Sequence, residues 1–122
     1  MQDFRRLFVW QKATRLTAEI YRTVNRAPAR RFPGLRSQLL RATASIATNI
    51  AEGCGRRSHR EFIHFGEIAI ASASEAEHHL ALARELGFIS AADHDRHVRA
   101  LIEVRRMLFG LLKTLRARKP ES

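Results

Sequence analysis

Two Glu-x-x-His motifs are the residues best suited to chemistry in this 122-residue sequence, namely Glu61-Phe-Ile-His64 and Glu75-Ala-Glu-His78. A di-iron carboxylate centre in a helical bundle takes one such motif from each of two helices and one glutamate from each of the other two. Here both motifs fall in one expected helix, and both histidines point away from its apolar centre. The pattern therefore does not favour a metal centre.

The other chemically capable residues form weaker patterns. His94 and His97 have an i,i+3 spacing that could bind a metal weakly, but random placement of six histidines explains it equally well. The lone Cys54 excludes an intramolecular disulfide and a cysteine-based zinc site. Arg56 and Arg57 could lower the pKa of its thiol, although a small residue filling a helix end is the simpler interpretation. We expect a non-enzymatic protein without catalytic residues, metal or cofactor.

The net charge is strongly positive and unevenly distributed. The chain carries 22 Lys and Arg against 12 Asp and Glu, a formal charge of +10. Residues 1–60 hold 13 of these basic residues and only 3 acidic ones, whereas residues 61–122 hold 9 of each. This excess indicates a surface that faces a polyanion, most simply nucleic acid. A compositional origin is the alternative, because 19 of the 22 basic residues are arginine, which a GC-rich genome would favour.

Hydrophobic periodicity predicts helices at about 7–27, 35–53, 58–87 and 91–118. A connector with two prolines and a glycine separates the first two, and Ser58 and Ser90 fit helix caps. Four amphipathic helices with short connectors predict an all-α, antiparallel up-down-up-down four-helix bundle. We expect one domain over residues 1–119 and a frayed tail at 120–122. No apolar run is long enough to span a bilayer and no signal peptide is evident, so we expect a cytoplasmic protein with no membrane partner.

One face of the first helix is unusually cationic. At about 100° per residue, five charged residues gather opposite the apolar face, and Glu19 is the only acidic one among them. The connector adds two further arginines. The predicted nucleic-acid-binding residues are Lys12, Arg15, Arg22, Arg26, Arg30 and Arg31. We expect binding to tolerate many sequences, because nothing in the chain resembles a recognition helix.

The second helix carries polar residues between two apolar stripes. The stripe Leu40, Ala44, Ala47 and Ala51 could be covered by a neighbouring subunit, although alanine also favours helix everywhere. Asn49 should hydrogen-bond across the bundle, because a buried unpaired amide is costly. Arg105 lies on the apolar stripe of the fourth helix, so it must either extend outward to water or pair with a carboxylate, which Glu75 or Glu52 would supply. Asn49, Glu52, Glu75 and Arg105 are thus predicted to form a structural polar core or interface.

Several motifs follow one family pattern. They are Val9-Trp10-Gln11-x-Ala13, Gly34-Leu35-x-x-Gln38-Leu39 and Ser45-Ile46-x-x-Asn49-Ile50-Ala51-Glu52-Gly53-x-Gly55-Arg56. The chain resembles the four-helix-bundle family first met as the protein encoded by intervening sequences in bacterial 23S ribosomal RNA genes. That family is similar to the accessory variability protein of diversity-generating retroelements, which binds nucleic acid and reverse transcriptase as a basic pentamer. The resemblance implies a homopentameric ring without established enzymatic activity.

The sequence departs from the family pattern at two places. Arg30-Arg31 stands where an acidic residue is usual, which raises the local positive charge. Gly66 stands where a larger apolar residue is common, so we expect a thin spot in the packing of the third helix.

These patterns favour a non-enzymatic, basic, oligomeric helical bundle that binds RNA or DNA sequence-tolerantly or scaffolds a nucleoprotein complex. The alternative is a protein–protein adaptor with no direct nucleic-acid role. A pull-down from nuclease-treated lysate separates the two hypotheses, because a direct protein partner survives nuclease.

Overall fold

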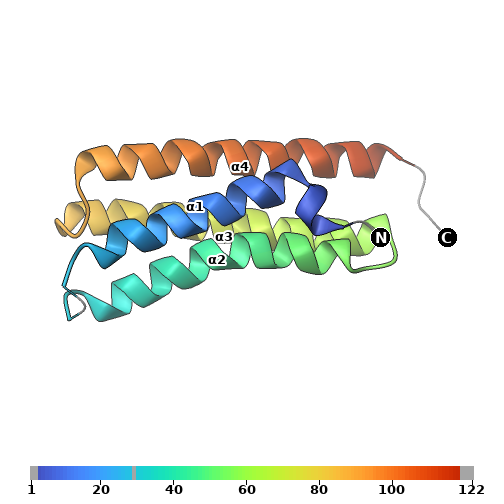
Figure 1. The fold of residues 1–122 in the computed structure, drawn as a ribbon. Coiled ribbons are helices and arrows are strands. Elements are labelled where there is room, and N and C mark those ends of the chain that lie inside the picture. Colours follow the sequence, from blue (N-terminus) through green and yellow to red (C-terminus); the bar gives the residue numbers. More distant parts are fainter. Residues whose placement is uncertain (1–2, 29, 119–122) are drawn as a thin grey trace.

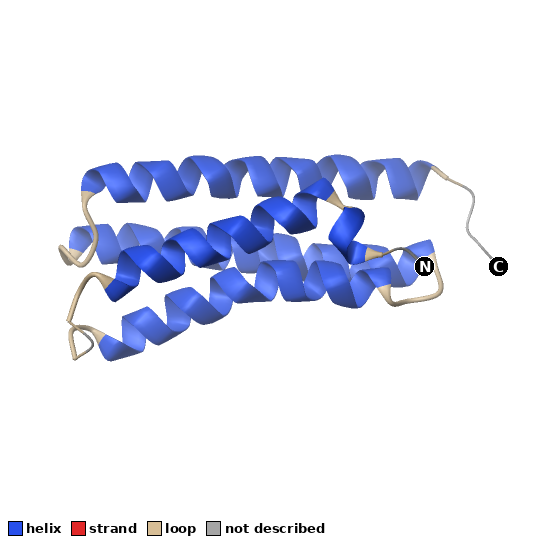
Figure 2. Cartoon of the chain, in the orientation of Figure 1, coloured by secondary structure: helices blue, strands red, loops and turns tan. Residues whose placement is uncertain are grey.

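The computed structural model describes residues 3–28 and 30–118, and its helices pack side by side along their length (Figure 1). A short 3-10 helix, η1 (Phe4–Arg6), precedes α1 (Phe8–Asn25), α2 (Pro33–Cys54), α3 (His59–Glu85) and α4 (Ala91–Ala117). Consecutive α-helices run in opposite directions, and the described ranges contain no strand (Figure 2). The prediction of an all-α four-helix bundle is confirmed. The predicted tail at 120–122 lies outside the described residues.

Local sequence signals set the helix ends. The Ser58 hydroxyl accepts a hydrogen bond from the Glu61 N–H at 3.2 Å and so caps the free amides at the start of α3. Ser90 does the same for Asp93 at the start of α4, at 3.0 Å. Helix α2 begins at Pro33, two residues before the predicted start, because proline suits the first turn of a helix.

Apolar side chains from all four α-helices meet in a main core, and a smaller cluster of Cys54, Phe62, Leu112 and Leu115 adjoins it. The largest fully buried ones include Ile20 of α1, Leu39, Ile46 and Ile50 of α2, Leu80 of α3, and Leu101, Leu108 and Leu112 of α4. Helix α3 contributes mostly alanine, with Ala69, Ala73, Ala76 and Ala83 completely buried. Small side chains let helix axes approach closely. No helix within the described ranges combines the length and apolar character needed to cross a membrane.

Gly66 does not leave the thin spot that the sequence suggested. It is buried in α3, and a Cβ built on it would lie 2.6 Å from Cδ2 of Leu112, a fully buried side chain of α4. Leu112 therefore occupies the space that a larger residue at position 66 would need. The expectation was wrong because the facing helix supplies the missing volume.

This packing predicts opposite effects for two glycine-to-alanine changes. Gly66→Ala gains up to about 1 kcal/mol of helix propensity but overpacks a closed site, which typically costs about 1–3 kcal/mol. We expect it to lower the free energy of unfolding by about 1 kcal/mol. Gly110→Ala is the matched control, because that exposed helical glycine has nothing within 4 Å of a built Cβ. It should raise stability by roughly 0.5–1 kcal/mol. Urea denaturation of both variants measures the difference, and equal effects would contradict the packing described.

Candidate nucleic-acid interface

Two of the four predicted α1 cations lie beside α4 at one end of the bundle. Arg22 and Arg26 of α1 line a shallow hollow together with Glu19 and with Arg96 of α4. All three arginines are exposed. The residues that line the hollow carry three guanidinium groups and one carboxylate. This surface is suited to an anion, because a guanidinium binds phosphate oxygens in a bidentate manner.

Two of the predicted phosphate-binding residues already have acidic partners. Lys12 Nζ lies 3.1 Å from Glu103 of α4, and the lysine side chain is only 30% exposed. Arg26 lies 3.3 Å from Asp93, which also pairs with Arg96 at 3.2 Å. One carboxylate therefore serves two arginines, so this group keeps a net positive charge.

Arg15 and Arg22 are the two α1 arginines available to a ligand. Both are exposed, and neither has an acidic side chain within ion-pairing distance in the part of the chain that the structure describes. Arg30 and Arg31 are exposed too, but they lie in the α1–α2 connector and do not line the hollow. The Arg31 guanidinium lies 5.3 Å from the centre of the Phe32 ring. The structure thus brings together Arg22 and Arg26 around the hollow, but not Lys12, Arg15 or the two connector arginines.

His97 lies beneath this surface and is 1% exposed. Its Nε2 is 2.7 Å from the Thr23 hydroxyl oxygen of α1. Burial, reinforced by the neighbouring Arg96, lowers the pKa of His97 below the usual histidine value. His97 is therefore neutral at pH 7 and adds no charge to the hollow above it.

The candidate metal and thiol sites take structural positions. His94 Nδ1 lies 2.9 Å from the Asp95 carboxylate, while His97 turns into the core, so the two rings have different partners. In the described ranges, no three or more His, Cys, Asp and Glu side chains are grouped to hold a metal ion. Cys54 is 1% exposed, and burial raises the pKa of its thiol. The lowered pKa that Arg56 and Arg57 suggested is wrong, because desolvation has the largest effect.

Asn49 bonds within its own helix and not across the bundle as predicted. Its Nδ2 donates to the Ser45 carbonyl at 2.8 Å and to the Ser45 hydroxyl at 2.9 Å. Ser45 makes the link between helices instead, with its Oγ 2.8 Å from Oγ of Ser72 in α3. The amide orients the serine, because a residue four positions later lies directly above it on the same helix face.

The predicted carboxylate partners of Arg105 are also wrong. Arg105 pairs with Glu77 of α3 at 2.8 Å and donates to the Ser74 hydroxyl at 3.3 Å. Glu75 instead lies 3.2 Å from His79 in its own helix, and Glu52 lies 3.2 Å from Arg56. Residues 75 and 77 differ by about 200° around a helix, so they face different neighbours.

Sequence reasoning missed the contribution of α4 to the basic surface. Arg96 lines the hollow with the α1 arginines, and Arg99 and Arg106 line a second hollow with Ile102 and Glu103. Residues 61–122 contain equal numbers of basic and acidic residues, so the charge count did not reveal these arginines. Several of the acidic residues lie on α3, whereas the arginines lie on α4. Their spacing of three and seven residues was the signal that could have found them.

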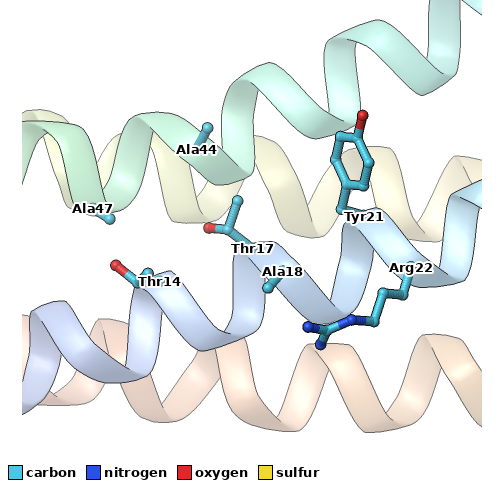
Figure 3. Close-up of a pocket in the computed structure, with 7 residues that line it drawn as sticks. All are labelled: Thr14, Thr17, Ala18, Tyr21, Arg22, Ala44 and Ala47. Carbon is cyan, nitrogen blue, oxygen red and sulfur yellow. The ribbon is translucent and has the colours of Figure 1, made fainter.

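A groove between α1 and α2 follows the second apolar stripe of α2. Figure 3 shows the residues that line it, with Tyr21 of α1 extending towards α2: Ala44 and Ala47 on α2, and Thr14, Thr17, Ala18, Tyr21 and Arg22 on α1. An adjoining hollow continues it along Phe4, Trp10, Thr48, Ala51 and Glu52. Tyr21 is 54% exposed beside these small residues. Leu40, which the prediction placed on this stripe, packs against the core.

Comparison with known proteins agrees with this architecture. The profile of the family described as 23S rRNA-intervening sequence protein matches residues 5–110. The chain belongs to this family. A crystal structure of a protein of unknown function from the S23 ribosomal protein family of Bacteroides thetaiotaomicron is similar, with a TM-score of 0.77 and 24% identity. The match covers 86% of this chain and 98% of that one, and at this identity it supports the fold alone. No curated protein matches the chain.

Proposed function

We propose that this member of the family is a non-enzymatic, cytoplasmic, oligomeric bundle that binds RNA or DNA, or scaffolds a nucleoprotein complex. Its α1/α4 surface would contact phosphates with little sequence preference. The observation that carries the proposal is the cluster of Arg22, Arg26 and Arg96 around one hollow, with Arg15 exposed nearby on α1. A solvated helix face normally mixes charge signs, whereas this surface holds more guanidinium groups than carboxylates.

Oligomerisation is the second part of the proposal. The groove between α1 and α2 is lined mainly by alanine, threonine and aromatic carbon, and a second copy of the chain would cover it. Small residues suit close contact between helices, and an interface of this kind repeats by symmetry. A homopentamer is what the sequence resemblance implies, through a family that resembles the accessory variability protein of diversity-generating retroelements. In such a ring the basic surfaces of all copies would act together.

Charge reversal at the two unpaired α1 arginines tests the nucleic-acid part. Arg15→Glu with Arg22→Glu should weaken binding to a mixed-sequence RNA at low salt by at least about tenfold, because charge-assisted phosphate contacts are lost. For a duplex, the slope of log K against log salt should become shallower by about 1.8, since each neutralised phosphate contributes roughly 0.9. Fluorescence anisotropy at several salt concentrations measures both quantities.

A matched variant separates a local site from overall charge. Arg41→Glu with Arg57→Glu makes the same change in net charge at exposed positions outside the hollow. We expect it to weaken binding much less than the α1 double variant. Equal weakening by the two variants, or wild-type binding that ignores salt, would sink the proposed site. A protein partner retained after nuclease treatment, without any nucleic-acid binding, would favour the adaptor hypothesis.

A further inference from the structure

The outer face of α4 carries cations and apolar side chains in alternation. Arg99, Ile102, Arg106, Phe109 and Lys113 follow one another at intervals of three and four residues. Side chains with this spacing lie on one face of a helix. All five are exposed, and Phe109 is 54% exposed although it is a large aromatic residue. We call these five residues the α4 stripe.

The cations of the α4 stripe are available to a ligand. Arg106 and Lys113 have no acidic side chain within ion-pairing distance among the described residues, and Arg99 donates only to the Asp95 carbonyl, at 3.4 Å. Arg99, Ile102 and Arg106 surround one hollow together with Glu103. Glu103 in turn holds Lys12 of α1 at 3.1 Å. The α4 stripe is therefore continuous with the basic surface of α1.

An exposed ring between cations suits a ligand with both phosphates and open base faces. A duplex hides the faces of its bases in the stack, whereas an unpaired strand can place a base on an aromatic side chain and its phosphates on neighbouring cations. Charge complementarity disfavours a basic partner such as a second copy of this face. An apolar partner would leave Arg106 and Lys113 desolvated without counter-charges, which is costly.

We infer that the α4 stripe binds single-stranded nucleic acid, with one base stacked on Phe109 and the phosphates held by Arg99, Arg106 and Lys113. This inference rests on the proposed function and names its substrate class. Ile102 offers an apolar contact about two helical turns before Phe109. The α1 arginines extend the phosphate-binding path beyond the stripe.

Substitution of Phe109 tests the stacking contact directly. Phe109→Ala should weaken binding of an unstructured single strand by about 5- to 150-fold, the usual range for loss of one stacked base. Binding of a duplex of equal length should change less than about twofold, since the duplex has no free base to stack. Phe109→Tyr should bind like the wild type, whereas Phe109→Leu should behave like Phe109→Ala because it keeps apolar area without a ring. Circular dichroism verifies that each variant folds.

The outcomes distinguish this inference from the function on which it rests. If the wild type binds neither single strand nor duplex, the proposed function fails and the inference fails with it. If it binds both, but Phe109→Ala lowers the two affinities equally or not at all, only the inference is overturned. A fall in oligomeric mass of Phe109→Ala in light scattering also overturns it, because the ring then contacts another copy of the chain.

Discussion

Ala47→Arg is expected to convert the proposed oligomer into folded monomers. Ala47 lines both hollows of the α1/α2 groove, next to Thr14 of α1 in each. It is therefore the α2 residue at the centre of the surface assigned to a second copy. In the isolated chain it is half-buried, so a long arginine side chain can extend from the groove into water.

A subunit that covers the groove would remove this arginine from water. Burying an uncompensated ion costs several kcal/mol, and the bulky side chain would also hold two helices apart. The expected change in light scattering is a fall from oligomeric to monomeric mass, with helical content unchanged by circular dichroism. Ala81→Arg makes the same substitution at an exposed position on α3 and should keep the wild-type mass. An Ala47→Arg variant of wild-type mass would show that another surface forms the interface, and a monomeric wild type would remove the oligomer proposal.

The positions of the helices could be predicted from the sequence, because the signals that mark a helix are local and several of them agree. Apolar residues repeat at three and four over each segment, and caps such as Ser58 and Ser90 mark the starts. Each signal acts within a few residues of the chain, so the helix order and the bundle follow without knowledge of neighbours. The boundaries were predicted less accurately: the start of α2 and the ends of α1 and α3 each differ from the prediction by two residues.

The partners of the polar side chains could not be predicted in the same way. Such a prediction needs the rotation of each helix about its axis, and neighbouring positions on a helix differ by about 100°. Arg105 reaches Glu77 and not Glu75 because of this rotation. Asn49 illustrates a second reason, since a backbone carbonyl one turn away accepts its hydrogen bond within the same helix.

The basic surface shows how a charge count over sequence halves misleads. The excess in residues 1–60 includes Lys12, which pairs with α4, whereas Arg99 and Arg106 add free charge from the balanced half. Helices that are distant in sequence form one surface here, so only the arrangement in space gives its charge. Arg36, which the charge count also included, has a structural role instead.

Arg36→Ala is expected to lower the free energy of unfolding by about 2–3 kcal/mol, in the range for hydrogen bonds to charged groups. Arg36 of α2 is half-buried and joins the start of its helix to the end of α1. Its Nη1 donates to the Asn25 side chain at 3.1 Å, and its Nη2 donates to the carbonyls of Ala27 and Pro28 at 3.1 and 2.9 Å. Its guanidinium carbon also lies 5.4 Å from the centre of the Phe88 ring.

The planar fork explains why no other residue should replace Arg36. Arg36→Lys keeps the positive charge, but one ammonium cannot reach a side-chain oxygen and two carbonyls in this geometry while covering a ring. It should lose most of the stability that Arg36→Ala loses. Arg41→Ala removes an exposed arginine of the same helix and should change stability by less than about 0.5 kcal/mol. Urea denaturation at one fixed protein concentration compares the three variants. Wild-type stability of Arg36→Lys would contradict this role, because it would mean that the positive charge alone matters at this position.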